Sequence, residues 1–340
     1  MAFENTPLKK HPKPEAIRQK QKTRNQINKS SMRKEIIFEM TSPYRDTFRI
    51  QGYWFGKGEK TVAIVGTMRG DEVQQQYITA SIVNALSEIE QCGGIMKGHS
   101  ILVIPTCNPF SLNVNHRFWS MDGTDINRMF PGYDRGETTQ RIAAAVFNHI
   151  KDFTYGIQLA SFYVPGDFIP HVRMLQTGYE AVEEGKLFQL PYVTLRKPLP
   201  FDTTLLNYNW QIWGTKAFSI YSGHTESIDE EKADMTQTAI LRFMHNVKTI
   251  HYRSLAAAYS STVVDESSLI NVQAKYAGIL QRSIHAGASV RKGDVLARII
   301  NPLDGNILDE VKAITDGAVF FSHHRPMVYQ NALLYKILPL

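Results

Sequence analysis

The sequence predicts an α/β fold in which a mixed, mostly parallel sheet is flanked by helices and is followed by a small all-β, barrel-like domain. Two observations predict it. Between residues 35 and 251, short apolar and β-branched runs alternate with segments of helical periodicity, as in proteins built on a parallel sheet. After Ala256, short strand-like runs are separated by Gly and Asp-Gly turns, which are typical of antiparallel hairpins.

The individual elements follow from these patterns in chain order. The expected strands are 35–40, 47–56, 61–65, 100–105, 156–160, 192–196 and 217–221, and the expected helices are 73–89, 138–152, 179–188 and 230–251. The segment after residue 160 is rich in aromatic residues, Gly and Pro and predicts a loop. We therefore divide the chain into a basic flexible arm (1–40, with a helix at 15–27), an α/β domain (41–258) and a β domain (259–340).

Composition limits the classes of function. The chain has 340 residues, of which 43% are hydrophobic and 21% charged, as in globular proteins, and no apolar run approaches the ~18 residues of a membrane span. Two cysteines form no disulfide framework, so we expect a cytoplasmic protein. The net charge of +6 comes from residues 1–34, where ten Lys or Arg face two Glu, and the body gives no support to nucleic-acid binding.

One strand, turn and helix organise the α/β domain. The buried run at 61–65 breaks at Gly66, passes through Arg69-Gly-Asp-Glu72 and enters a helical pattern at Val73. Active sites of open α/β sheets form at such strand ends. The turn resembles the first metal motif of the succinylglutamate desuccinylase/aspartoacylase family, zinc hydrolases of the carboxypeptidase type. That motif reads His-Gly-Asp-Glu, and its His and Glu bind zinc.

A longer segment carries the resemblance most specifically. Residues 117–132 contain Arg117 and the run Asp122-Gly-Thr-Asp-Ile-Asn127-Arg128-Met-Phe-Pro-Gly132, which matches Arg…Asp-Gly-x-Asp-Leu-Asn-Arg-x-Phe-Pro-Gly of the family. The resemblance covers roughly residues 45–340 and implies a zinc carboxypeptidase-like fold. It also implies that the β domain is the lipoyl-like barrel found in many members. Its hairpin turns at 304–305 and 316–317 present no Lys for lipoate or biotin, so a structural or access-limiting role is expected.

The positions that the family uses for chemistry differ here. Glu72 matches the carboxylate ligand, but Arg69 stands at the first His position, and Ala160 stands at the second. Arg is permanently protonated and repels a dication. Tyr221 stands at the position of the general-base Glu, and a phenol with an ordinary pKa near 10 is a poor base at neutral pH.

The recognition positions are retained. The resemblance implies that Arg117 polarises the scissile carbonyl, that Asn127 and Arg128 hold a substrate carboxylate, and that Asn108 and His171 lie at the site. A guanidinium suits a carboxylate because it can donate two parallel hydrogen bonds. The structural alternative is that Arg117 or Arg128 only pairs with Asp122 or Asp125. A displaced metal site would use Glu72, His171 and His224, whose spacing imposes no common face.

The sequence is compatible with three functions, of which we expect the first. The first is a non-hydrolytic protein that binds a small carboxylate-bearing ligand or a partner protein and has no cofactor. The second is an amide hydrolase of N-acyl amino acids or small peptides with zinc in a displaced site. The third is polyanion binding through the arm. We expect a small carboxylate or an acylated amino acid as ligand, leave self-association open, and expect no membrane partner.

Overall fold

The computed structural model describes residues 32–42 and 45–340. The first 31 residues of the predicted arm, including the helix expected at 15–27, lie outside the described residues. Residue 33 already begins the first strand, which forms a hairpin with the second. Among the described residues, no helix is long and apolar enough to cross a membrane.

The predicted fold class is confirmed. In the described part of the chain, a 13-stranded sheet has the main order β1-β2-β4-β3-β5-β8-β6-β15-β17-β10. Its central strands β4, β3, β5 and β8 run parallel, and the flanking pairs are antiparallel. The strands of the α/β part are β1 (Arg33–Ser42), β2 (Arg45–Gly56), β3 (Gly58–Thr67), β4 (Gly98–Thr106), β5 (Tyr155–Leu159), β6 (Gly166–Leu175), β7 (Tyr192–Arg196), β8 (Lys216–Gly223) and β9 (Thr262–Asp265).

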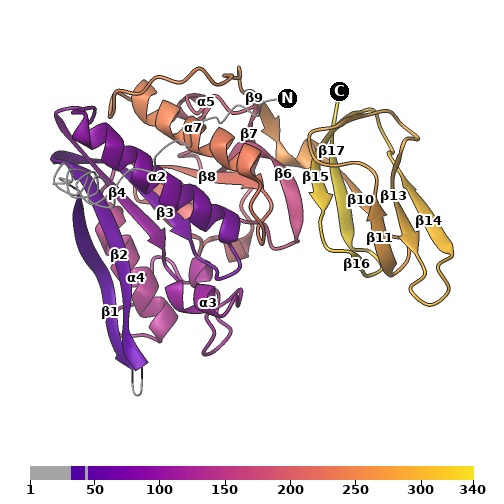
Figure 1. Cartoon of the computed structure of the whole chain (residues 1–340), viewed down its shortest axis with the longest axis horizontal. Coiled ribbons are helices and arrows are strands. Elements are labelled where there is room, and N and C mark those ends of the chain that lie inside the picture. The colour runs from indigo at the N-terminus through magenta and orange to yellow at the C-terminus, as the bar shows by residue number, and fades with distance from the viewer. Residues whose placement is uncertain (1–31, 43–44) are drawn as a thin grey trace, which may run out of the picture.

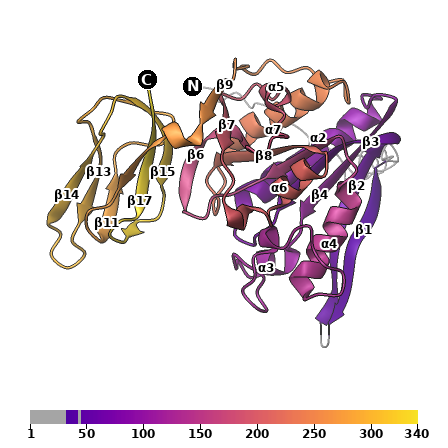
Figure 2. The same ribbon diagram turned by 180° about the vertical axis from the view of Figure 1, so that it is seen from behind.

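Helices cover both faces of this sheet (Figures 1 and 2). The helices are α2 (Val73–Gln91), α3 (Pro109–Asn113), α4 (Thr138–Ile150), α5 (Val182–Lys186), α6 (Leu206–Ile212) and α7 (Glu230–Asn246), with 3-10 turns η1 (Ile126–Arg128), η2 (Pro200–Asp202) and η3 (Glu266–Ser268). One apolar core joins α2 and α7 to the sheet, and a second joins α4 and α6 to its opposite face. Burial on both faces explains why β3 and β4 contain continuous apolar runs.

The C-terminal strands continue the large sheet. They are β10 (Ile270–Gln273), β11 (Gly278–Arg282), β12 (Ser289–Val290), β13 (Val295–Ile300), β14 (Ile307–Lys312), β15 (Gly317–His323), β16 (Met327–Val328) and β17 (Leu333–Pro339). β14, β13, β11 and β16 form a second, antiparallel sheet. β15 pairs with β6 through Phe321 opposite Phe168 and Ser322 opposite Asp167. These C-terminal strands, residues 270–339, are called the β module below. The β module is therefore joined to the α/β part by backbone hydrogen bonds as well as by side-chain packing.

Several elements differ from the expectation, and α3 and β9 are additional to it. The predicted loop after residue 160 contains β6, which is buried along most of its length although polar residues such as Asp167 and Arg173 interrupt its apolar pattern. The short helix α6 was not expected, because its seven residues carry too few turns for a periodic signal. Helix α7 ends at Asn246, earlier than the expected 251, and Lys248 follows with φ +60°.

Substitution of Phe321 tests the junction between β15 and β6, where the C-terminal strands join the α/β part of the sheet. Its ring is fully buried and lies 4.7 Å from that of Phe168, centroid to centroid. Replacing Phe321 by Ala should lower the free energy of unfolding by about 3–5 kcal/mol, because a large buried ring leaves a cavity. Denaturant unfolding measures this loss. Tyr329→Ala, at a ring that is 82% exposed, is the control and should change stability by less than ~0.5 kcal/mol. Equal losses of unfolding free energy in the two variants would contradict a stabilising role of Phe321 at this junction.

Candidate functional site

The candidate site lies at the carboxyl ends of the central strands. β3 ends at Thr67, just before the Arg69–Glu72 turn, and β5 ends at Leu159, just before Ala160 and Ser161. These segments face a cleft of about 360 Å³. Its lining includes the predicted Arg69, Asn127, Arg128, Ala160 and Tyr221, together with Ser161, Arg173, Arg196, Asp202, Glu266 and Lys336.

Glu72 is held by its own turn. Its side chain is 1% exposed, and Oε2 accepts hydrogen bonds from the backbone N–H groups of Met68 (2.7 Å) and Arg69 (3.0 Å). Oε1 accepts from Arg69 Nη1 (3.0 Å) and from the Ser161 hydroxyl (2.5 Å). Both carboxylate oxygens are thus saturated by the chain itself.

Arg69 bridges two carboxylates. Besides Glu72, its guanidinium donates to Asp125 Oδ2 from Nη2 (2.8 Å) and Nε (3.2 Å). The Arg69 side chain is 9% exposed. Burial alone would lower the pKa of the guanidinium, but the charges of Asp125 and Glu72 raise it above the usual value, so Arg69 stays protonated. A permanent cation therefore sits between the two carboxylates, next to Ala160 and Ser161 in the cleft lining.

Two further groups of cations line the cleft. Arg128 and Arg196 both contact the buried Asp202, with 3.6 Å between Arg128 Nη1 and Oδ1. Arg173 donates to Glu266 Oε2 (2.6 Å) and to the Tyr221 hydroxyl (3.0 Å). The lining therefore carries five cationic side chains, with Arg69 and Lys336, and the two carboxylates of Asp202 and Glu266. Because Glu72 and Asp125 compensate Arg69, the excess positive charge comes from the Arg128–Arg196 pair, which shares one carboxylate, and from Lys336. This surplus of positive charge suits an anionic ligand.

Asn127 and Tyr221 are fixed by different means. The Asn127 side-chain oxygen accepts from Gln158 Nε2 (3.1 Å) and from the backbone N–H of Leu206 (3.4 Å). Tyr221 stacks on His171 with ring centroids 5.3 Å apart, and His171 Nδ1 contacts the Ile169 carbonyl (2.8 Å). Burial lowers the pKa of His171 from 6.5 to about 4, so its ring is neutral at pH 7. His171 lines a smaller adjoining cavity with Tyr221 and Arg173.

Arg117 and Asn108 lie outside the lining of this cleft. Arg117 donates to Asp71 Oδ2 (2.7 Å) and to the Phe162 carbonyl (3.1 Å), so its carboxylate partner is neither Asp122 nor Asp125. Asn108 is the N-cap of α3 and accepts from the Ser111 backbone N–H (3.2 Å).

The displaced metal set of Glu72, His171 and His224 does not gather. In the described part of the chain, three potential metal ligands come together at Asp167, His224 and Asp229, with ligand atoms within 4.8 Å of one another. Lys232 already places its ammonium there, 2.5 Å from Asp167 Oδ1 and 3.2 Å from Asp229 Oδ2. The single charge of Lys232 thus compensates part of the charge of these two carboxylates.

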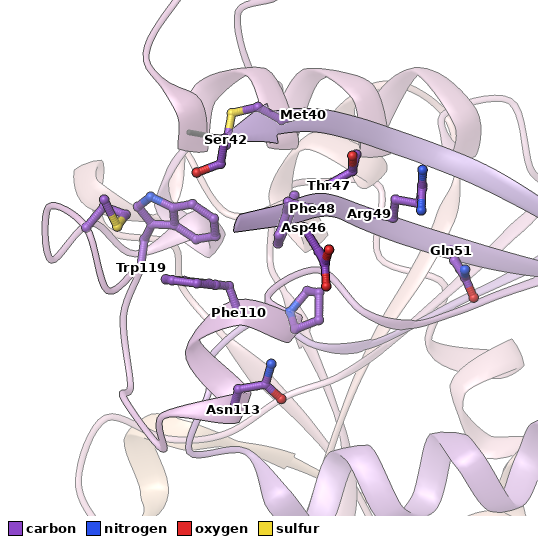
Figure 3. A pocket seen from close by; sticks show the side chains of 12 residues that line it. Met40, Ser42, Asp46, Thr47, Phe48, Arg49, Gln51, Phe110, Asn113 and Trp119 are labelled. Atoms are coloured by element: carbon purple, nitrogen blue, oxygen red, sulfur yellow. The ribbon is translucent and has the colours of Figure 1, made fainter. Parts of the chain in front are cut away.

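A larger pocket of about 490 Å³ lies between the β1–β2 hairpin and α3 (Figure 3). Figure 3 shows Phe110, Trp119, Phe48 and Met40 around it. Its lining also includes the polar residues Ser42, Asp46, Thr47, Arg49, Gln51 and Asn113. The smaller cleft is the stronger candidate because its polar and charged groups converge at strand ends.

The comparisons with known proteins agree with this fold. Residues 58–159 match the succinylglutamate desuccinylase/aspartoacylase catalytic domain. A succinylglutamate desuccinylase from Silicibacter sp. TM1040 has a similar structure, with a TM-score of 0.75 at 15% identity, covering 92% of this chain and 96% of that one. The product-bound ectoine utilization protein EutE (DoeB) from Ruegeria pomeroyi gives 0.74 at 17% identity, covering 92% and 97%.

A curated relative points to the same group. The N-alpha-acetyl-L-2,4-diaminobutyric acid deacetylase of Halomonas elongata is 22% identical over 280 residues, or 76% of each protein. The fold is a zinc carboxypeptidase-like α/β architecture. The resemblance of this chain to the succinylglutamate desuccinylase/aspartoacylase family is confirmed by the match of residues 58–159 to that family's catalytic domain.

Sequence reasoning missed several residues of the cleft. Arg196, Asp202, Glu266 and Lys336 lie far from the recognised motifs, on β7, η2, η3 and β17. No local pattern marks them, since each becomes part of the site only through the pairing of distant strands. Ser161 had one available signal, because it directly follows the strand-end Ala160.

Substitution of Arg69 tests how far its positive charge stabilises the buried Glu72 carboxylate. Arg69→Met should lower the free energy of unfolding by about 3–5 kcal/mol, because it leaves Glu72 buried without its cation. The double variant R69M/E72Q should lose less than the sum of the two single changes. The control is Arg49→Met, since the exposed Arg49–Glu39 pair should contribute under ~1 kcal/mol. The pairing would be contradicted if denaturant unfolding gave the double variant a loss equal to the sum of the losses of R69M and E72Q.

His171 should make stability depend on pH. Its pKa is 6.5 when exposed and about 4 in the fold, so the unfolded state binds the extra proton between these values. Stability contributed by the neutral ring is complete above pH 6.5 and falls as the pH drops to 4, by about 3 kcal/mol in total. His171→Phe should flatten unfolding free energy against pH in this window. An unchanged slope would contradict the assignment.

Proposed function

We propose that this protein binds a small carboxylate-bearing ligand in the cationic cleft and does not act as a zinc hydrolase. The observation that carries the proposal is the Arg69 guanidinium, which joins Glu72 and Asp125 from inside the family's metal motif. A side-chain cation there supplies the positive charge that a metal would otherwise provide. Binding would then remain while hydrolysis is lost.

The donor set does not fit a zinc ion. A catalytic zinc of this class needs two neutral imidazoles, one free carboxylate and an open position for water. Here Arg69 and Ala160 stand at the imidazole positions, and Glu72 already accepts four hydrogen bonds. At the general-base position, the Tyr221 hydroxyl accepts a hydrogen bond from the cationic Arg173.

The cleft is better suited to binding an anion than to holding a zinc ion. Arg128 and Arg173 both line it, and each is oriented by a carboxylate of the chain. Arg196 lines it as well, beside the Asp202 carboxylate. A carboxylate is the group that guanidinium N–H donors recognise best.

A second candidate is hydrolysis of N-acyl amino acids. The 22% identical deacetylase favours it, as does the retained Asn127–Arg128 pair in the cleft. Such an enzyme would need a metal held elsewhere. The group of Asp167, His224 and Asp229 offers ligands, but Lys232 would have to leave it.

Metal analysis and ligand binding together test the proposal. Protein purified in metal-free buffer should contain no stoichiometric zinc and should bind succinate in isothermal titration calorimetry. Arg196→Met should weaken this binding by about tenfold or more, because it removes a charged hydrogen-bond donor worth ~1.5–3 kcal/mol. Arg298→Met, at an exposed residue of the β module, is the matched control and should bind normally.

Restoring the family's ligands gives the complementary test. The double variant R69H/A160H, with Glu72 retained, should gain zinc affinity, because it recreates two imidazoles and a carboxylate. Stoichiometric zinc in the unchanged protein, or turnover of N-acetyl or N-succinyl amino acids that Glu72→Gln abolishes, would overturn the proposal in favour of hydrolysis.

A further inference from the structure

Lys336 is a cation of the cleft that has no ion-pair partner among the described residues. It lies on β17, and its side chain lines both the main cleft and the small cavity beside it. Its Nζ lies 5.4 Å from the centre of the Phe162 ring. The nearby Glu266 carboxylate is already held by Arg173 at 2.6 Å. Lys336 therefore brings an amine from the β module to the ligand cavity without a carboxylate to anchor it.

The surroundings favour the neutral form of this amine. Burial lowers the pKa of Lys336 below its usual value, and the positive charges of Arg173 and Arg196 lower it further, against the opposing charge of Glu266. A lysine beside other cations in a partly desolvated pocket is a better nucleophile than an exposed one, because more of it is unprotonated at neutral pH.

Two neighbouring groups fit the partners that such an amine would need. Arg173 and Arg196 line the same cleft, and the charge of their guanidinium groups suits a ligand carboxylate beside Lys336. The Tyr221 hydroxyl lines the same cleft and accepts from Arg173, while its own hydrogen has no acceptor among the described residues. A carboxylate anchor, an amine and a phenolic proton donor thus share one cavity.

We propose that Lys336 forms a reversible imine with a 2-oxo carboxylate bound in this cleft, an inference that rests on the proposed function and names its ligand class. The neutral Lys336 amine attacks the ketone carbon, forming a C–N bond, and one of the amine's protons passes to the ketone oxygen to give a neutral carbinolamine. The Tyr221 hydroxyl donates a second proton to that oxygen, which leaves as water while the nitrogen lone pair forms the C=N bond. The proton that remains on the iminium nitrogen then returns to the Tyr221 phenolate, so that Tyr221 is restored. Hydrolysis reverses the sequence without any oxidant or reductant.

Reductive trapping tests the inference on the full-length protein. Incubation with pyruvate or 2-oxoglutarate and sodium cyanoborohydride should add the mass of the 2-oxo acid less one oxygen atom, at Lys336, in intact-mass and peptide mass spectrometry. Lys336→Gln and Lys336→Arg should both lose the label. Lys275→Gln is the matched control, at a 77% exposed lysine of the same module, and should keep it. Labelling spread over exposed lysines, or unchanged in Lys336→Gln, would overturn the inference.

Succinate separates this inference from the proposed function. Succinate carries carboxylates but no ketone, so it should compete with labelling of Lys336 without being trapped. If succinate binds while no label forms at Lys336, the imine is refuted and the binding function stands. If Lys336 is labelled while succinate neither binds nor competes, the imine stands and the binding of a dicarboxylate without a ketone is refuted. If neither is observed, both are refuted.

Discussion

The ion pair between Arg69 and Glu72 is the interaction on which the candidate site depends. Both side chains are buried, and the pair lies in the turn between β3 and α2. Moving two charges out of water is costly unless each finds partners. Backbone N–H groups, Ser161 and Asp125 complete those partners. The turn that in the family's motif binds a metal is here closed by the chain's own cation.

The same solution appears at a second place. Asp167 and Asp229 approach one another beside His224, and Lys232 inserts its ammonium between the carboxylates. In both groups a side-chain cation takes the place that a dication could fill. This supports the proposal that electrostatic balance in this chain is kept without a metal, whereas the surplus of cations in the cleft favours a bound anion.

The continuous sheet gives the β module a direct part in the cleft. Because β15 pairs with β6, and β17 pairs with β15, Lys336 is carried close to Arg173 on β6. Glu266, on the connection that leads into the module, anchors that arginine. A module that looked structural from its turns thus supplies groups to the ligand cavity, which is the basis of the imine proposal.

The sequence alone determined the fold class and the centre of the site. Alternating apolar runs and helical periodicity are local signals, and they placed β3, α2 and the Arg69–Glu72 turn. The motif around Asn127 and Arg128 also lay within one segment, so it was readable without coordinates. The structure then placed both residues in the cleft.

Only the tertiary structure decided which charges meet. Arg69 reaches Asp125 across 56 residues, Arg117 pairs with Asp71 instead of Asp122 or Asp125, and Lys336 joins Arg173 through strand pairing. The physical reason is that ion pairs and cavities depend on distances between segments remote in sequence, whereas periodicity and turn chemistry depend on neighbours.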